Sequence, residues 1–336
     1  MDQREQGLTK ALATIVEAAN AALNAGKPAA SGHPHGHGHG HSHANDAEGG
    51  VDVGCAIRQL PKRLLARAAE TARRINPVNA PVFGPVALMS FADDVTQPAK
   101  LSVLIGKYWG PTPRVLTVSF LDSPAADLRA RIIAHLNAWS RTACISFVET
   151  SGVGQVRIAR AGGGYWSYLG TDILHIPRNR ATMNLEGFTM GTPDSEFVRV
   201  VRHEAGHTLG FPHEHMRRDI VARIDPEKAY EYFRRTQGWD RPTVDQQVLT
   251  PLDERSIMGT PADDTSSMCY MLPGSITRDG RPIPGGRDIN PTDYAFAGQV
   301  YPKSGKGTEP SHEAAHGGDD WPESEDVPEA DVRSAA

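Results

Sequence analysis

The segment that decides the fold and the chemistry of this chain is His203-Glu204-Ala205-Gly206-His207-Thr208-Leu209-Gly210-Phe211-Pro212-His213. Two histidines four residues apart lie above one another on one helical face, so both imidazoles can reach one metal ion. Gly210 can leave the helix with a positive φ, and Pro212 prevents the helix from resuming. The turn brings His213 to the same ion. Three protein ligands with one open position are typical of a catalytic zinc site.

Glu204 follows the first histidine and points near the ion without having to bind it. A carboxylate in that position suits a general base acting on metal-bound water. Zinc lowers the pKa of such water towards about 7, which makes hydroxide available at neutral pH. The segment therefore predicts one catalytic Zn²⁺ held by His203, His207 and His213, with Glu204 as the catalytic residue.

The segment resembles the motif of the metzincin zinc proteases. Glu214 after the third histidine, with Arg217 and Asp219 soon after it, is similar to the astacin branch of these peptidases. Four further stretches resemble bacterial astacin-like peptidases, and the likeness runs from about Lys107 to Pro302. They are Lys107–Trp109, the Gly162–Gly170 loop, Thr182–Leu185 and the helix start Asn290–Asp293.

A metzincin also carries a methionine turn beneath the metal, and Ser267-Met268-Cys269-Tyr270 resembles it, with Cys269 where astacins have histidine. The resemblance implies that Tyr270 is an extra zinc ligand that swings away and stabilises the tetrahedral intermediate. Ser256-Ile257-Met258-Gly259 is a rival turn, but it lacks the tyrosine and lies closer to the helix. We therefore favour Met268.

The resemblance implies an α+β, zincin-like metzincin fold. Its N-terminal lobe holds a twisted mixed sheet and the active-site helix, and its irregular C-terminal lobe holds the methionine turn and a C-terminal helix. It also implies a zinc metalloendopeptidase that cleaves peptide or protein substrates, with the strand at 165–169 as the rim to which substrate adds. Two alternatives stay open. One is a non-catalytic metal-binding protein, against which the presence of Glu204 argues, and the other is a zinc hydrolase of a non-peptide substrate.

Hydrophobic periodicity predicts elements along the whole middle of the chain. The expected strands are Arg114–Phe120, Cys144–Glu149, Gln155–Ala159 and an edge strand at Tyr165–Leu169. The expected helices are Lys62–Arg74, one capped by Ser123 that runs to Ser140, one from Thr192 that stops at Gly210, and Asn290–Val300. His135 and His175 are interpreted as structural. His215 is either a fourth nitrogen ligand or faces solvent or a carboxylate.

Composition limits the remaining functions. The 336 residues divide into an Ala-rich and His/Gly-rich segment (1–50), an N-terminal extension (51–106), the catalytic domain (107–302) and an acidic tail (303–336). The net charge is −5, and the tail alone has nine acidic and three basic residues, or −6, so the rest of the chain sums to about +1 and offers no electrostatic case for nucleic acid. No apolar run is long enough to span a membrane. Three cysteines are too few for a disulfide framework, and without a clear signal peptide we expect a cytoplasmic chain or export by a non-Sec route.

Two features lie upstream of the catalytic body. Histidines alternate with small residues from His33 to His43, which predicts a flexible linker or a loose metal-binding tract. Phe91-Ala92-Asp93-Asp94-Val95 resembles the inhibitory segment of astacin proforms, so Asp94 could occupy the fourth position on zinc. Cys55 is a rival ligand, because thiolates bind zinc strongly. The extension could therefore be an intramolecular inhibitory segment, or its aspartates could lie in a solvated turn.

Overall fold

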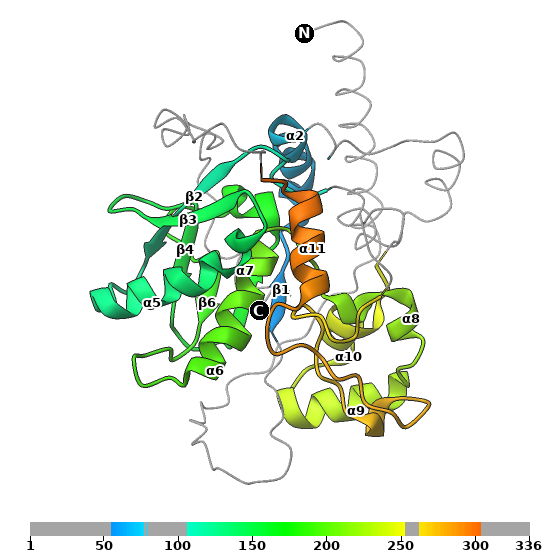
Figure 1. The fold of residues 1–336 in the computed structure, drawn as a ribbon. Coiled ribbons are helices and arrows are strands. Elements are labelled where there is room, and N and C mark those ends of the chain that lie inside the picture. The colour runs from blue at the N-terminus through cyan, green and yellow to red at the C-terminus, as the bar shows by residue number, and fades with distance from the viewer. Residues whose placement is uncertain (1–54, 77–78, 80–105, 253–261, 304–336) are drawn as a thin grey trace, which may run out of the picture. The chain divides into compact units, whose positions relative to one another are not determined.

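One mixed sheet of six short strands organises the computed structural model, which describes residues 55–76, 79, 106–252 and 262–303. The strand order is β1-β5-β6-β4-β2-β3, and only β5 and β6 pair antiparallel (Figure 1). The strands are β1 Ala56–Arg58, β2 Arg114–Phe120, β3 Ile145–Glu149, β4 Val156–Ala159, β5 Tyr165–Tyr168 and β6 Met183–Leu185.

The centre of the sheet follows from the alternation in β2. Leu116 and Val118 share one face, and both are fully buried. β2 pairs in parallel with β3 on one side and with β4 on the other, so its apolar face lies in the middle of the main core. The predicted strands in this region are confirmed to within a residue or two at their ends.

The prediction of β5 as an edge strand is wrong in this structure. Residues 56–58 form β1, which pairs in parallel with β5 in the register Ala56 with Trp166 and Arg58 with Tyr168. A three-residue strand carries too little periodicity to be recognised from sequence. The sheet edge that the catalytic body offers is therefore covered by a segment from the N-terminal extension.

Helices and short helical turns make up much of the rest of the described structure. The regular helices are α2 Leu65–Ile75, α5 Ala126–Leu136, α6 Asp194–Glu196, α7 Arg202–Thr208, α8 Arg218–Val221, α9 Pro226–Gln237, α10 Arg241–Val244 and α11 Pro291–Val300. The short 3₁₀ turns are η1 Lys62–Leu64, η3 Asn137–Arg141, η4 Gly170–His175, η6 Glu214–Met216 and η8 Gly274–Ile276. Two π turns, η5 Phe197–Val201 and η7 Asp245–Leu249, also lie within the described residues.

Local chemistry explains where two of these helices begin. Asn290 caps α11 in a capping box with Asp293, as the sequence predicts. The predicted cap at Ser123 is wrong, because Ser123 has a φ of 48° and lies in a turn before α5, which begins at Ala126. A residue in the left-handed region lacks the extended backbone that a helix N-cap needs.

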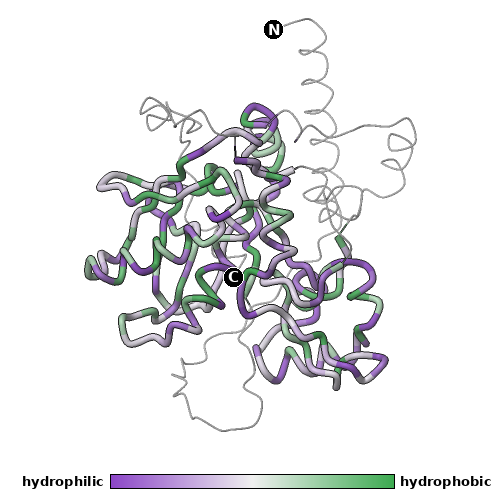
Figure 2. The backbone as a smooth tube through the Cα atoms, in the orientation of Figure 1, coloured by the Kyte–Doolittle hydropathy of each residue, from purple (hydrophilic) through white to green (hydrophobic). Residues whose placement is uncertain are grey.

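Two hydrophobic cores hold the described residues together. The larger one lies between the sheet and the helices α5 and α7, and includes Trp109, Trp139 and Met268. The smaller one lies among α8, α9 and the chain from 269 to 283, and Cys55 belongs to it. Hydrophobic and hydrophilic residues are interspersed along the described chain (Figure 2). None of the described helices has the length and apolar character needed to cross a bilayer.

Several sequence predictions concern residues outside the described ranges. They are the segment 1–50 with its histidine tract, Asp94, the rival turn at Met258 and the tail from 304 onward.

Candidate metal centre

The metal-binding segment is one continuous helix followed by a sharp turn. α6, η5 and α7 follow without interruption from Asp194 to Thr208. Gly210 then has a φ of +96°, a left-handed conformation that favours glycine. The Trp109 indole donates to the Thr208 carbonyl at 2.8 Å, and the Tyr301 hydroxyl donates to the Leu209 carbonyl. These bonds satisfy the last carbonyls of the helix and fix the turn that carries His213 back.

Two of the three histidines are oriented by backbone carbonyls. Nδ1 of His203 donates to the Ser267 carbonyl at 2.6 Å, and Nδ1 of His207 donates to the Phe211 carbonyl at 2.7 Å. Each Nε2 atom is then the nitrogen that carries a lone pair. Nε2 of His203 has no hydrogen-bond partner among the described residues, and the Nε2 atoms of His207 and His213 are 3.0 Å apart. The nitrogens therefore converge on one point.

All three imidazoles are buried, and His207 and His213 are fully inaccessible. Burial lowers the pKa of His203 to about 4 and the pKa of His207 and His213 well below the usual value. The rings are thus neutral at neutral pH, which is the form that binds metals. Three neutral imidazole nitrogens are a donor set that zinc accepts, so these residues fit the expected ion.

Glu204 is buried beside the histidines. Burial raises the pKa of its carboxyl to about 8, while the neighbouring Cys55 thiol and the Arg199 charge oppose this rise. Neither carboxylate oxygen accepts a hydrogen bond of normal geometry from the described residues, although the thiol is close enough to affect the pKa. A buried carboxylate with free acceptor capacity is suited to exchanging protons with a reacting group.

The turn at Met268 lies directly under the metal-binding helix. A Cβ atom at Gly206 would come within 2.4 Å of the Met268 sulfur, so the side chain of Met268 abuts the helix backbone. The Met268 carbonyl also accepts from the backbone N–H of Glu214 at 2.8 Å. Together with the bond from His203 to Ser267, these contacts bind the turn to both ends of the histidine segment.

Tyr270 follows this turn and packs against the histidines. Its ring lies 4.4 Å from the His213 ring and is stacked on His215 at 4.1 Å, centroid to centroid. It lines the same cavity as Glu204 and His203. The sequence places Tyr270 at the metal by resemblance alone, and the structure brings it to the edge of the histidine cluster.

His215 differs from both sequence interpretations. It is fully buried, so it does not face solvent. Its Nε2 atom donates to the Gln247 carbonyl at 2.9 Å, and its Nδ1 atom accepts from the backbone N–H of Tyr270 at 3.4 Å. Both ring nitrogens are occupied, so His215 supports Tyr270 by stacking instead of binding the ion.

The Glu214 carboxylate pairs with Arg217 at 3.1 Å and accepts from the backbone N–H of Asp263 at 3.2 Å. Burial raises its pKa to about 7, and the Arg217 charge opposes this. It lines a cavity beside Tyr108 and Phe211, so it is not a simple surface acid.

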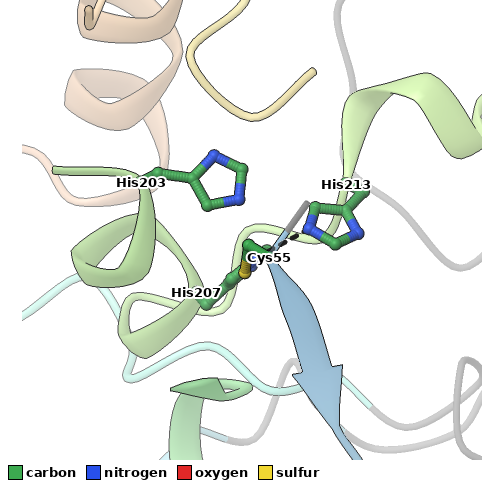
Figure 3. Close-up of side chains that lie close together, drawn as sticks. All are labelled: Cys55, His203, His207 and His213. Carbon is green, nitrogen blue, oxygen red and sulfur yellow. Dashed lines mark hydrogen bonds between the residues drawn. The ribbon is translucent and has the colours of Figure 1, made fainter. Parts of the chain in front are cut away.

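A fourth side chain joins the three histidines. The Cys55 sulfur and one nitrogen from each of His203, His207 and His213 all lie within 4.8 Å of one another. Figure 3 shows Cys55 at the start of β1, among the side chains of His203, His207 and His213. The sequence marks Cys55 only as a rival to Asp94, because no local pattern reveals which distant segment reaches the helix.

The sequence and the fold both resemble those of known proteins. A model of the astacin peptidase family matches residues 105–267. The solved structure of myroilysin is 32% identical, with a TM-score of 0.56, and the match covers 59% of this chain and 97% of that one. The chain belongs to the astacin family. The zinc metalloproteinase nas-27 of Caenorhabditis elegans is 30% identical over 91 residues, which are 27% of this chain and 19% of that protein.

Membership of the astacin family confirms the predicted family and the predicted α+β metzincin fold. The family is one of metallopeptidases, so the predicted enzyme class and the predicted zinc ion are those of the family. The chain spans about a fifth of the length of the nematode relative.

Proposed function

We propose that this chain is a zinc-dependent endopeptidase in which His203, His207 and His213 hold the ion and Glu204 moves the protons. The observation that carries the proposal is the convergence of three neutral imidazoles on one point beside a buried carboxylate. Zinc held there would supply a Lewis acid that polarises a carbonyl and lowers the pKa of water.

The protein groups then have separate tasks. Glu204 accepts a proton from the attacking water at a carboxylate oxygen and later delivers it to the leaving amine. Its burial keeps bulk water away from this transfer. The short distance of 4.4 Å between the Tyr270 and His213 ring centroids supports a role for the Tyr270 hydroxyl as donor to the oxyanion that forms on the former carbonyl oxygen. We therefore assign Glu204 and Tyr270 as catalytic residues.

Peptide substrates suit the sheet edge beside the site. β5 leads from Tyr165 to Tyr168, and Tyr165 lines the cavity that holds Glu204. The pairing of β1 with β5 supports this assignment, because the edge accepts an extended backbone segment. Main-chain pairing alone does not select side chains, so preference would come from residues that line the cavity, such as Arg199 and Tyr232.

Replacement of Glu204 by Gln tests the proposal, because it keeps the shape of the side chain and removes the base. The substitution is made in the full-length chain carrying Cys55→Ser, so that the thiol in the cluster cannot compete with substrate. We expect one zinc per chain to remain bound while cleavage of a mixed peptide library falls about 10²–10⁴-fold.

The matched control is Glu149→Gln, which removes a surface carboxylate that pairs with Arg129. It should leave both zinc content and cleavage unchanged. Normal turnover by zinc-loaded Glu204→Gln protein would remove Glu204 from the mechanism. A zinc-loaded Cys55→Ser chain that cleaves no peptide at all would refute the proposed function itself.

A further inference from the structure

One side chain, that of Gln247, binds the backbone of an extended segment beside the metal centre. The Gln247 amide oxygen accepts from the Ile57 N–H at 3.2 Å, and the amide nitrogen donates to the Ile57 carbonyl at 3.3 Å. Ile57 lies in β1, two residues after Cys55, whose sulfur lies within 4.8 Å of the histidine nitrogens. Both bonds are to main-chain atoms of Ile57, so they do not depend on the identity of its side chain.

These bonds lie on the side of β1 that faces away from β5. In extended backbone the N–H and C=O of one residue point to the same side, and those of its two neighbours point to the other side. Ile57 directs both groups to Gln247, so Ala56 and Arg58 direct theirs to β5, with which they pair. Gln247 and β5 thus bind opposite edges of one extended segment.

We propose that Gln247 is a substrate-binding residue that holds the main chain of a peptide lying on the edge of β5. The inference rests on the proposed function and adds one subsite to it. A peptide that adds to β5 takes the place of residues 56–58, because these residues occupy that edge in this structure. The peptide residue in the place of Ile57 then presents its own N–H and C=O to the Gln247 amide.

A primary amide suits this task because it carries both an acceptor oxygen and a donor NH₂ group. It can accept from an N–H and donate to a C=O whether the peptide runs parallel to β5, as β1 does, or antiparallel to it. Because both bonds are to main-chain atoms, Gln247 adds affinity without selecting a side chain. The contact therefore lets one cleft hold extended peptides of different sequence.

The surroundings of Gln247 keep its amide in this position. The residue is 7% exposed, and the next residue, Val248, is fully buried in the smaller core. The Gln247 carbonyl accepts from Nε2 of His215 at 2.9 Å, and the His215 ring is stacked on Tyr270 at 4.1 Å. A buried amide loses free energy when its partners leave, so a peptide that replaces residues 56–58 and restores both bonds is favoured.

N-methylation of single, non-scissile peptide bonds in a substrate tests the contact. The enzyme is the zinc-loaded full-length chain carrying Cys55→Ser, and the parent peptide is one that it cleaves well. Each methyl group removes one N–H donor. Pairing with β5 alone would make alternate positions sensitive, and the position between two sensitive ones would tolerate the methyl group.

With Gln247 on the opposite edge, the intervening position about two residues from the scissile bond should be sensitive as well. Methylation there should lower kcat/KM about tenfold, because it leaves the buried amide oxygen without its donor. The ratio of kcat/KM for the methylated and parent peptides is measured within one enzyme. Displacement of residues 56–58 affects both peptides equally, so it cancels from this ratio.

Gln247→Ala in the same chain should remove the penalty at that one position, because the alanine side chain neither needs the donor nor contacts the methyl group. The matched control is Gln246→Ala, because Gln246 is the exposed neighbour in the same π turn. The control should keep the tenfold penalty.

Tolerance of the methyl group at the intervening position, in a peptide that is still cleaved, would overturn the inference and leave the proposed function intact. This result needs only the Cys55→Ser chain, so it stands whether or not Gln247→Ala folds. An equal penalty in Gln247→Ala and Gln246→Ala would also overturn the inference, since another group would then bind that edge. No cleavage of any peptide by the zinc-loaded chain would instead refute the proposed function itself.

Discussion

Gly206 sets how closely α7 approaches the turn that carries Met268. A Cβ atom at this position would lie 2.4 Å from the Met268 sulfur, 3.0 Å from its terminal carbon and 3.2 Å from the Trp139 ring. Trp139 is almost fully buried and donates to the Arg202 carbonyl at 2.7 Å, so it has little freedom to move. The Met268 side chain must therefore shift if Gly206 is replaced by Ala.

The size of this effect follows from two opposing contributions. Overpacking of a dense core costs about 1–3 kcal/mol. Alanine is favoured over glycine inside a helix by about 1 kcal/mol, so Gly206→Ala alone should lower the free energy of unfolding by about 0–2 kcal/mol. Met268→Ala should cost about 2–5 kcal/mol, because it empties a buried volume. In the double variant the new Cβ atom enters that volume, and the loss should be smaller than the sum by about 1–3 kcal/mol.

Urea unfolding measures all four proteins, in the presence of a chelator so that zinc binding does not contribute. Met190→Ala provides the control cycle, because Met190 is 46% exposed and lies outside the core. Its combination with Gly206→Ala should be additive. Additivity within about 0.5 kcal/mol for the Gly206 and Met268 pair would show that the two do not touch, and would refute the placement of this turn beneath the helix.

Two further predictions concern Tyr270 and His175. In the Cys55→Ser chain, Tyr270→Phe should lower kcat about 10²–10³-fold with a smaller change in KM, and wild-type kinetics would remove the hydroxyl from the mechanism. Burial, together with the charges of Arg67, Lys107 and Arg74, lowers the pKa of His175 to about 4. The unfolded chain therefore binds a proton first as pH falls below about 6.5, and His175 should lower the free energy of unfolding by about 1–2 kcal/mol between pH 7 and pH 5. His175→Gln should remove this part of the pH dependence of the free energy of unfolding, which urea unfolding at pH 7 and pH 5 measures. The same pH dependence in both proteins would show that His175 is not its source.

The metal-binding helix is predictable because its signals are local. Thr192-Pro193 marks its beginning, Gly210 marks its end, and the spacing of His203 and His207 follows the helical repeat. The positions of the β2, β3 and β4 strands are also predictable, but their order in the sheet is not, because β3 and β4 are consecutive in the chain and yet lie on opposite sides of β2. The π turn Phe197–Val201 inside the helix has no such signal, because a change in hydrogen-bond register leaves the apolar pattern almost unaltered.

Cys55 shows where local patterns are insufficient. Its neighbour Ile57 is bound by Gln247, 190 residues away in sequence, and β1 is too short to show alternation. From sequence, Asp94 and Cys55 are both single metal-binding side chains upstream of one domain. The tertiary pairing of β1 with β5 brings Cys55 to the histidines, and no pattern in the sequence announces that pairing.

His215 is another residue whose surroundings cannot be predicted from the neighbouring sequence. Two positions after His213, its local context favours solvent, yet the structure buries it between Tyr270 and the Gln247 carbonyl. The Gln247 side chain in turn binds Ile57, so contacts run without a break from the ring beside the metal cluster to the strand that carries Cys55. Because His215, Gln247 and Ile57 lie far apart in sequence, these contacts cannot be predicted from the residues next to each of them. The three-histidine segment can therefore be predicted from sequence, whereas the contacts that bring Cys55 to it depend on how distant segments fold against one another.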